Sequence, residues 1–335
     1  MRDKAKTQRH RRAELTVIVT GAAGFVGMYT AQRLLDRGET VIGVDVFNDY
    51  YDPALKAARA AKLEAQDRFR MARMDIADVS GFAALVKASG AKRIVHLAAQ
   101  AGVRYSLENP FAYERSNLAG HLSVLEACRH NGVEHLVYAS SSSVYGDRPQ
   151  SGEGFKESDA AVEPVSLYAA TKRSGELMSY SYGRLYRLAQ TGLRFFTVYG
   201  PMGRPDMAYF SFTKKIFAGE PIEVFGQGEM SRDFTYIDDI VTGVVAALDH
   251  APPVGENRIL NIGGGRPEGL MDMISTLEKA IGREAVKVYK PMQPGDVSRT
   301  FADVSKLKDI TGYTPEVPIE VGLPRFVEWY RGFYG

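Results

Sequence analysis

Short runs of apolar and β-branched residues alternate with helical patterns over residues 16–200 of this 335-residue chain. Strands that alternate with helices of this length form parallel sheets with right-handed crossovers. The sequence therefore predicts an α/β fold built on a doubly wound parallel sheet. Strands are expected at 16–20, 39–45, 92–99, 135–141 and 191–200, with a further one ending before Asp75. Helices are expected between them, at 26–37, 54–64, 79–89, 111–131 and 168–189.

The alternation stops near residue 200, where Pro, Gly and Met become frequent in GPMGRPDM. The strand-like pieces that follow are short and scattered, which is typical of a smaller mixed α/β lobe over residues 201–335. Residues 14–200 are then expected to form the main domain, and segments near 238–262 are expected to return to its sheet. Residues 1–13 are basic and lack the apolar segment of a signal peptide, so we expect a disordered tail there.

Composition excludes several classes of function. The formal net charge of +2 is too small for a nucleic-acid or membrane surface, and no run of about 18 apolar residues could span a bilayer. Cys128 is the single cysteine, so no disulfide can form within the chain, and a reducing, cytoplasmic compartment is expected. The histidines show no metal-binding spacing, and no metal site is expected.

A glycine-rich turn directly follows the first expected strand. TVIVTGAAGFVG places Gly21, Gly24 and Gly27 before a helix, where glycines let the backbone approach a pyrophosphate and the helix N-terminus supplies N–H donors. Asp45 ends the second strand, where a carboxylate accepts both hydroxyls of an adenosine ribose and repels a 2′-phosphate. The sequence therefore predicts a Rossmann-type site that binds NAD rather than NADP.

Two further segments are candidates for the same site, and each has a structural alternative. Asp75 could meet the adenine edge or could cap the helix that follows it. The small residues of 96–102 could lie flat against the cofactor or form a tight turn. The residues expected to contact NAD are Gly21, Gly24, Phe25, Val26, Gly27, Asp45, Asn48, Asp75, Ile76, Leu97, Ala98, Ala99, Asn117, Ser140, Tyr168 and Lys172.

The stretch ASSSSVYG (139–146) could be a solvated loop, but it follows apolar residues at the end of an expected buried strand. SLYAATKRSGE then places Tyr168 and Lys172 four residues apart on one helix face. A lysine ammonium beside a phenol favours the phenolate and lowers the tyrosine pKa, so that the tyrosine can act as a general base. This spacing is common by chance, and its place after a dinucleotide motif and a serine-bearing strand end makes it a candidate.

In this order, the motifs resemble those of the extended short-chain dehydrogenases/reductases. The resemblance implies that Tyr168 removes a proton from a substrate hydroxyl, while NAD takes hydride from the same carbon and Lys172 holds the nicotinamide ribose. It places Ser141 as the third catalytic residue. Asn117 matches a position that supports the active site in this superfamily, and its alternative is a polar contact inside a helix.

Position 143 bears on the reaction. Related dehydratases and decarboxylases have an acidic residue just before Val-Tyr-Gly, where this chain has Ser143 after Ser142. Without an added acid or base, removal and return of hydride is favoured, which indicates an epimerase. Seven stretches resemble UDP-glucuronate 4-epimerases, among them FNDYYDPALK (47–56) and RDFTYIDDI (232–240). Met202 departs from this resemblance, since the family usually has tryptophan there.

The resemblance implies a UDP-glucuronate substrate with UDP-galacturonate as its epimer. Hydroxyls at the ends of two neighbouring strands and a guanidinium in the next loop would face the sugar carboxylate, and arginines would hold the diphosphate. The residues expected to contact the substrate are Arg104, Ser141, Ser142, Ser143, Tyr168, Thr197, Arg204, Arg232, Asp296 and Arg299. Tyr236 and Phe225 could flank the uracil or pack in the core.

Three alternatives stay open for the function. The first is a 4-epimerase of UDP-glucose or UDP-N-acetylglucosamine, and the second is a UDP-glucuronate decarboxylase, which Ser143 disfavours. The third is a non-catalytic dinucleotide-binding regulator, which an intact set of Ser141, Tyr168 and Lys172 disfavours. Helices 111–131 and 168–189 could pair with a second subunit, so a homodimer is expected; their alternative is packing on the sheet within one chain.

Overall fold

Seven parallel strands form the central sheet in the computed structural model, which describes residues 15–147, 152–292 and 299–335. In spatial order they are β11 (Asn257–Ile262), β6 (Gln190–Phe195), β5 (His135–Ser141), β4 (Arg93–His96), β1 (Thr16–Thr20), β2 (Thr40–Asp45) and β3 (Phe69–Arg73). The predicted doubly wound sheet is confirmed. The expected tail at 1–13 and the candidate Asp296 lie outside the described residues.

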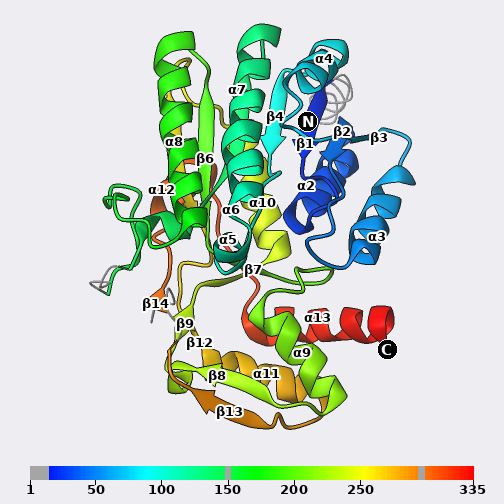
Figure 1. Ribbon diagram of the computed structural model, residues 1–335, viewed down its shortest axis with the longest axis vertical. Coiled ribbons are helices and arrows are strands. Elements are labelled where there is room, and N and C mark those ends of the chain that lie inside the picture. Colours follow the sequence, from blue (N-terminus) through cyan, green and yellow to red (C-terminus); the bar gives the residue numbers. More distant parts are fainter. Residues whose placement is uncertain (1–14, 148–151, 293–298) are drawn as a thin grey trace, which may run out of the picture.

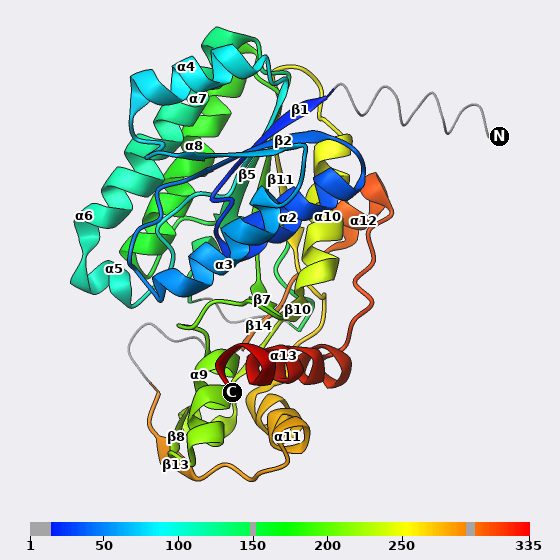
Figure 2. The same cartoon turned by 90° about the vertical axis from the view of Figure 1, so that its right-hand side faces the viewer.

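Helices cover both faces of this sheet (Figures 1 and 2). One face carries α4 (Val79–Ser89), α7 (Gly120–Asn131) and α8 (Leu167–Tyr186). The other carries α2 (Phe25–Asp36), α3 (Pro53–Glu64), α10 (Ile237–Asp249) and α12 (Ser305–Thr311). The chain leaves the main sheet after β6 and returns to it later, because α10 and β11 belong to this domain. A domain boundary at residue 200 stays a prediction.

The apolar runs of the strands explain this layering, because a strand covered on both faces buries every side chain. Val17 and Val19 of β1 point into one core with α2, whereas Ile18 between them points into a second core with α4 and α7. All three side chains are buried. Successive residues of one strand therefore supply both cores.

A smaller lobe lies beyond the carboxyl ends of the strands (Figure 1). Its helices are α9 (Ala208–Ala218), α11 (Leu270–Ile281) and α13 (Ile319–Tyr334). They lie beside a pair of strands, β8 (Ile222–Phe225) and β13 (Lys287–Lys290). Short strands connect the lobe to the sheet domain: β7 (Thr197–Tyr199) with β10 (Phe234–Tyr236), and β9 (Ser231–Arg232) with β12 (Glu268–Gly269) and β14 (Arg299–Thr300). 3₁₀ turns occupy Ser142–Tyr145 and Gly226–Gly228.

Several elements differ from the expectation. The strand predicted at 92–99 ends at His96, and the helix predicted at 168–189 ends at Tyr186. The strand predicted at 191–200 breaks at Phe196, because the Phe196 nitrogen donates to the Ile262 oxygen while the Thr197 nitrogen donates to the Asp233 oxygen. The helix predicted at 111–131 is in three parts, namely α6 (Pro110–Tyr113), a π-helical turn at Glu114–Ala119 and α7, with α5 (Tyr105–Glu108) before them. In the described residues, no helix is both long and apolar enough to cross a membrane.

Candidate active site

The glycines of the loop between β1 and α2 stand where a side chain has no room. Gly21 has a φ of 72°, and a Cβ there would lie 2.8 Å from the Ala98 nitrogen. A Cβ at Gly27 would lie 1.9 Å from the Gly21 oxygen. Gly24 is the N-cap of α2, and none of the described side chains caps this helix, so its first N–H groups can receive an anion. The loop therefore fits a dinucleotide pyrophosphate.

Asp45 presents a buried carboxylate at the end of β2. Its Oδ2 accepts from the Ala23 nitrogen at 3.1 Å and its Oδ1 from the Phe47 nitrogen at 2.8 Å. Each oxygen keeps a second lone-pair direction for a ribose hydroxyl. Lys56 of α3 lies 3.6 Å from Oδ1, and its burial lowers the pKa of this lysine. Together with the glycine loop, Asp45 fits the adenosine half of NAD.

Other residues expected at the cofactor surround this edge of the sheet. Asn48 accepts a hydrogen bond from Lys56 at 2.7 Å, and the Ala98 nitrogen donates to the Thr20 hydroxyl at 3.1 Å. The side chains of Phe25 and Ile76 are buried in the two cores. Val26, Leu97 and Ala99 are partly buried.

Asp75 does not cap the helix that follows it. Asp78 is the N-cap of α4 and accepts from the Gly81 nitrogen at 3.0 Å. Asp75 instead accepts from the Ala77 nitrogen and pairs with the Arg115 Nε, each at 2.8 Å. The helix-cap alternative for Asp75 is therefore wrong, because the helix starts three residues later than that reading requires. A contact of Asp75 with adenine stays a prediction.

The serines at the end of β5 point in different directions. The Ser140 hydroxyl donates to Glu176 Oε1 at 2.6 Å inside the protein, so its backbone is the part left for a cofactor. The Ser143 hydroxyl donates to the Ser141 oxygen at 2.9 Å, and the Ser143 nitrogen donates to the same oxygen at 3.2 Å. Ser141 is thus held at the strand end by the 3₁₀ turn that follows it, which rules out the solvated-loop reading.

Tyr168 and Lys172 lie on the first turns of α8, which Ser166 caps by accepting from the Ala169 nitrogen at 3.1 Å. The buried Lys172 Nζ donates to the Ala139 oxygen at 2.9 Å. Burial, followed by the charge of Arg204, lowers the pKa of Lys172 to about 8. Burial raises the pKa of Tyr168 above its usual value, against the lowering expected from the sequence, although the Ser141 hydroxyl and the Arg204 charge act to lower it. Ser141, Tyr168 and Lys172 are therefore brought together.

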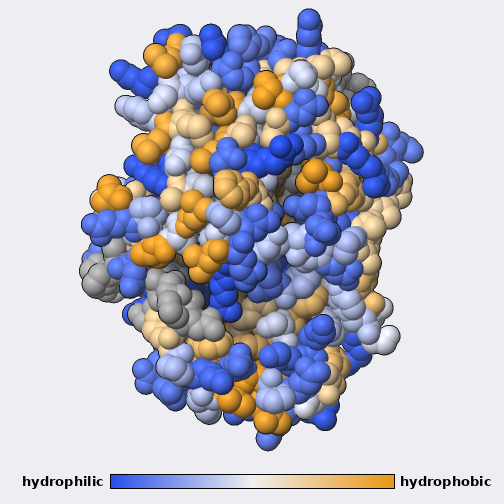
Figure 3. All heavy atoms as spheres, in the orientation of Figure 1, coloured by the Kyte–Doolittle hydropathy of each residue, from blue (hydrophilic) through white to orange (hydrophobic). Residues whose placement is uncertain are grey.

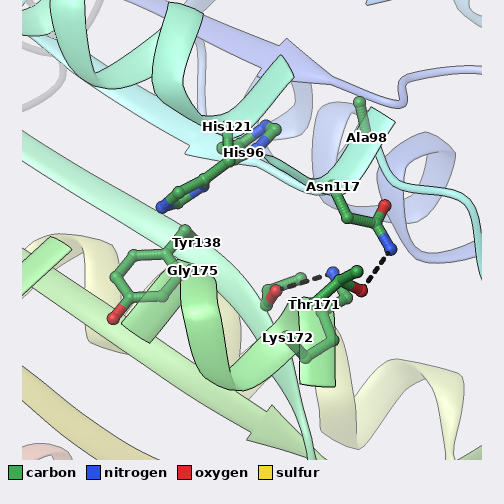
Figure 4. A pocket seen from close by; sticks show the side chains of 9 residues that line it. His96, Ala98, Asn117, His121, Tyr138, Thr171, Lys172 and Gly175 are labelled. Carbon is green, nitrogen blue, oxygen red and sulfur yellow. Dashed lines mark hydrogen bonds between the residues drawn. The ribbon is translucent and has the colours of Figure 1, made fainter. Parts of the chain in front are cut away.

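A small polar pocket lies behind Lys172 (Figure 4). Asn117, within the π-helical turn, donates to the Thr171 hydroxyl at 3.1 Å and to the Gln100 oxygen at 3.0 Å, and accepts from the Gln100 nitrogen at 2.8 Å. It thus links the loop after β4 to α8, one residue before Lys172. His96 and His121 line the same pocket with stacked rings. The π turn gives Asn117 its orientation, which a continuous helix would have changed.

Of the residues expected at the sugar carboxylate, Arg204 is close enough to Tyr168 to act on its pKa, and Ser143 contacts Ser141. Ser141 pairs with Phe195 across β5 and β6, and Thr197 follows two residues later. Arg204 lies in the loop after β7, where its Nε is 3.1 Å from Asp206 Oδ1. Asp206 also accepts from the Tyr50 hydroxyl at 3.2 Å. A substrate carboxylate at Arg204 would therefore compete with Asp206.

The arginines expected at the diphosphate lie on adjacent short strands. β14 pairs with β9 so that Thr300 faces Arg232 and Arg299 faces Ser231. Arg104 lies over the ring of Phe225, 5.8 Å from its centroid, and so joins the sheet domain to the lobe.

Tyr236 is, beside Phe225, the other aromatic residue that could flank the uracil. Its side chain is only 4 % exposed and is part of the main core, so the core-packing alternative holds for Tyr236.

Two cations near the site were not expected from the sequence. Lys56 pairs with Asp45, and Arg59 donates to backbone oxygens of both the glycine loop and the loop after β7. Both lie on the buried face of α3, in the stripe formed by Leu55 and Leu63. Cations within the apolar stripe of an amphipathic helix are the signal that could have identified them.

Comparison with known proteins gives a consistent result over the length of the chain. Residues 17–263 match the model of the NAD dependent epimerase/dehydratase family. A probable UDP-glucuronate 4-epimerase of Rhizobium meliloti (strain 1021) is 47 % identical over 95 % of this chain and 97 % of its own. UDP-glucuronate 4-epimerase 4 of Arabidopsis thaliana is 45 % identical over 100 % of this chain and 79 % of its own.

A solved structure is also similar to this chain. It is the UDP-glucuronic acid 4-epimerase of Bacillus cereus, in complex with UDP-glucuronic acid and NAD. The two share 35 % sequence identity and superpose with a TM-score of 0.88, over 96 % of this chain and 100 % of the other.

Proposed function

The chain belongs to the NAD dependent epimerase/dehydratase family, and on this premise we propose that it is a UDP-glucuronate 4-epimerase. It inverts C4 of the sugar and so interconverts UDP-glucuronate and UDP-galacturonate. Its cofactor is NAD, which the glycine loop and Asp45 fit. The identity with named 4-epimerases over nearly the whole chain supports this assignment.

The observation that carries the proposal is the hydroxyl of Ser143 beside Ser141. Elimination of water or loss of carbon dioxide would be assisted by an acidic group at this position. Asp206 is the carboxylate whose charge reaches Tyr168, but Arg204 and Tyr50 engage it. The site therefore favours a reaction that ends when hydride returns to C4.

The residues of the chain supply a base, an orienting hydroxyl and positive charge. Tyr168 takes the proton of the O4 hydroxyl, and Ser141 stabilises the phenolate that makes this possible. Arg204 is the neighbouring cation that favours the phenolate, and Lys172 is the cation one helical turn after Tyr168. When bound, NAD accepts hydride from C4 and returns it to the opposite face of the 4-keto sugar.

Retention of the carboxylate is the second requirement, because a 4-keto uronate is a β-keto acid that loses carbon dioxide readily. Ser142 and Thr197 hold the carboxylate through hydroxyl groups, and Arg204 adds charge; Ser143 joins them when its hydroxyl turns away from Ser141. Hydroxyls orient a carboxylate without strongly changing its charge. Loss of carbon dioxide breaks the bond between C5 and C6. In this orientation that bond is kept away from the geometry that favours its cleavage.

The nucleotide lies toward the lobe. Arg232 and Arg299 neutralise the diphosphate from adjacent strands, and Arg104 approaches from the sheet domain. Asp296 is assigned to the uridine ribose on the resemblance alone, since it lies outside the described residues.

We also propose a homodimer and a cytoplasmic location. Apolar side chains on α7 and α8 are between 41 % and 69 % exposed, namely Leu122, Leu177, Tyr180 and Leu185. Figure 3 shows hydrophobic residues among hydrophilic ones over these two helices. Pairing of α7 and α8 with a second copy would bury them in a four-helix bundle. The single, buried Cys128 suits a reducing compartment.

The test is to incubate the pure protein separately with UDP-glucuronate, UDP-glucose and UDP-N-acetylglucosamine and to identify products by NMR. We expect UDP-galacturonate from the first and no product from the neutral sugars. Conversion of a neutral sugar with none of the uronate would reassign the substrate, and a pentose product would indicate a decarboxylase. Tyr168→Phe is the control, and turnover retained by that variant would indicate that the site is not catalytic.

A further inference from the structure

Arg59 of α3 is a buried guanidinium that joins two loops at the site. Its side chain is 0 % exposed. Nη1 donates to the Ala23 oxygen at 3.2 Å and to the Tyr51 hydroxyl at 2.6 Å. Nε and Nη2 donate to the Met202 oxygen at 3.0 and 2.5 Å, and Nη2 also donates to the Gly203 oxygen at 3.0 Å. These bonds use all the N–H donors of the guanidinium group.

None of the acceptors that Arg59 contacts in the described part of the chain carries a charge. A buried cation without a carboxylate is costly, and the hydrogen bonds to the carbonyl groups offset part of this cost. What the guanidinium alone provides is a rigid planar fork that can hold several carbonyl groups at once. Arg59 therefore serves to hold the carbonyl groups of the two loops in fixed positions, and not to neutralise a charge.

The loop that Arg59 holds is bent into a conformation that other residues rarely adopt. Met202 has a φ of 55°, in the left-handed region, and such residues persist where their surroundings over-determine them. Tyr29 of α2 adds a hydrogen bond to the Pro201 oxygen at 3.1 Å. Residues 201–203 are therefore fixed by α2 and α3, the two helices that also bracket the glycine loop and Asp45.

Arg204 follows this fixed segment directly. We propose that Arg59 is a positioning residue that makes the placement of Arg204 depend on the conformation of the glycine loop, through the Ala23 and Met202 carbonyl groups. Binding of NAD at the glycine loop and binding of the sugar carboxylate at Arg204 are then coupled. This inference rests on the proposed function, because it takes UDP-glucuronate as the ligand.

The experiment compares two ligands that differ in the sugar. In a Tyr168→Phe background, which prevents turnover, UDP-glucuronate and UDP are titrated calorimetrically with and without NAD. Arg59→Lys keeps the charge but loses the fork. We expect Arg59→Lys to lower the affinity for UDP-glucuronate by about tenfold, the effect of one or two hydrogen bonds. The affinity for UDP should stay the same. We also expect NAD to strengthen UDP-glucuronate binding only where Arg59 is present.

A second variant keeps the test decisive if Arg59→Lys does not fold. Tyr29→Phe removes only the bond to the Pro201 oxygen, and a smaller selective loss of UDP-glucuronate affinity is expected. An equal loss for UDP and UDP-glucuronate, or no loss for either, overturns the inference, since a general structural defect would act on both. Conversion of UDP-glucuronate by the unaltered protein is measured first, and its absence rejects the proposed function instead.

Discussion

The side-chain oxygens of Ser141 and Ser143 lie 2.9 Å apart at the end of β5. The Ser143 hydroxyl and the Ser143 nitrogen both donate to the Ser141 oxygen. A hydroxyl oxygen has two acceptor directions and one hydrogen, so these bonds leave the hydrogen of Ser141 to be donated outward. Its direction is toward the Tyr168 phenol, whose pKa the Ser141 hydroxyl acts to lower.

Loss of the Ser141 hydroxyl should therefore impair the base. We expect Ser141→Ala to lower kcat by about 100-fold, in the range of general acid–base effects, and to move the rising limb of the pH profile upward. Ser143→Ala should have a smaller effect on kcat, because the Ser143 nitrogen still orients Ser141. Both are measured by NMR with UDP-glucuronate, and a larger loss in Ser143→Ala than in Ser141→Ala would contradict this arrangement.

The pKa of Lys172 predicts a decline of activity in alkaline solution. Burial and the charge of Arg204 lower this pKa to about 8, so the ammonium loses its proton as the pH rises through that value. Since the proposed role of Lys172 requires its charge, kcat should fall above a pH of about 8. Lys172→Arg keeps a cation, which stays protonated, and should move the decline to higher pH at a lower overall rate. If kcat of Lys172→Arg falls at the same pH as that of the unaltered protein, the decline is not caused by deprotonation of Lys172.

The fold was largely predictable because periodicity and strand ends are local properties. The strand at 135–141 and the helix at 79–89 have the predicted bounds. The break at Phe196 was not predictable, because it depends on hydrogen bonds to Ile262 and Asp233, which are distant in the sequence.

The candidate site divides in the same way. The order of the glycine loop, the serine run and Tyr168 with Lys172 along the chain indicated which residues would meet at one edge of the sheet. The π turn around Asn117 arises from tertiary packing, and no local pattern indicated it. The place of Arg59 in the apolar stripe of α3 could have marked it as buried, but its partners depend on tertiary packing.

The hydroxyl groups near the sugar carboxylate predict a diagnostic side product. Ser142→Ala or Thr197→Ala should let the carboxylate rotate after oxidation at C4, so that some 4-keto intermediate loses carbon dioxide. The expected result is release of a UDP-4-keto-pentose and carbon dioxide beside UDP-galacturonate, with the hydride left on the cofactor as NADH, so NAD is supplied in excess. The pentose is detected by NMR and mass spectrometry. Absence of this product from both variants, with epimerisation retained, would show that the hydroxyls do not protect the carboxylate.

Buried histidines predict a loss of stability in acid. Burial lowers the pKa of His121 to about 3 and that of His135 to about 4, and it also lowers that of His96. In the unfolded chain a histidine titrates near pH 6.5. Between these values the unfolded state binds more protons than the folded state, so stability is lost as the pH falls below about 6.5.

His121 offers a direct test, because its ring stacks on His96 in the pocket behind Lys172 (Figure 4). Its Nε2 lies 2.9 Å from the Ser179 oxygen. His121→Gln keeps a polar group for Ser179 but does not titrate. Urea denaturation at a series of pH values below 6.5 should show a free energy of unfolding that falls less steeply, by about 1.4 kcal/mol per pH unit. The comparison variant is His130→Gln on the surface of α7, which removes an exposed histidine in place of a buried one. If His121→Gln has the slope of the unaltered protein, His121 is protonated in the folded state and the cause assigned here is wrong.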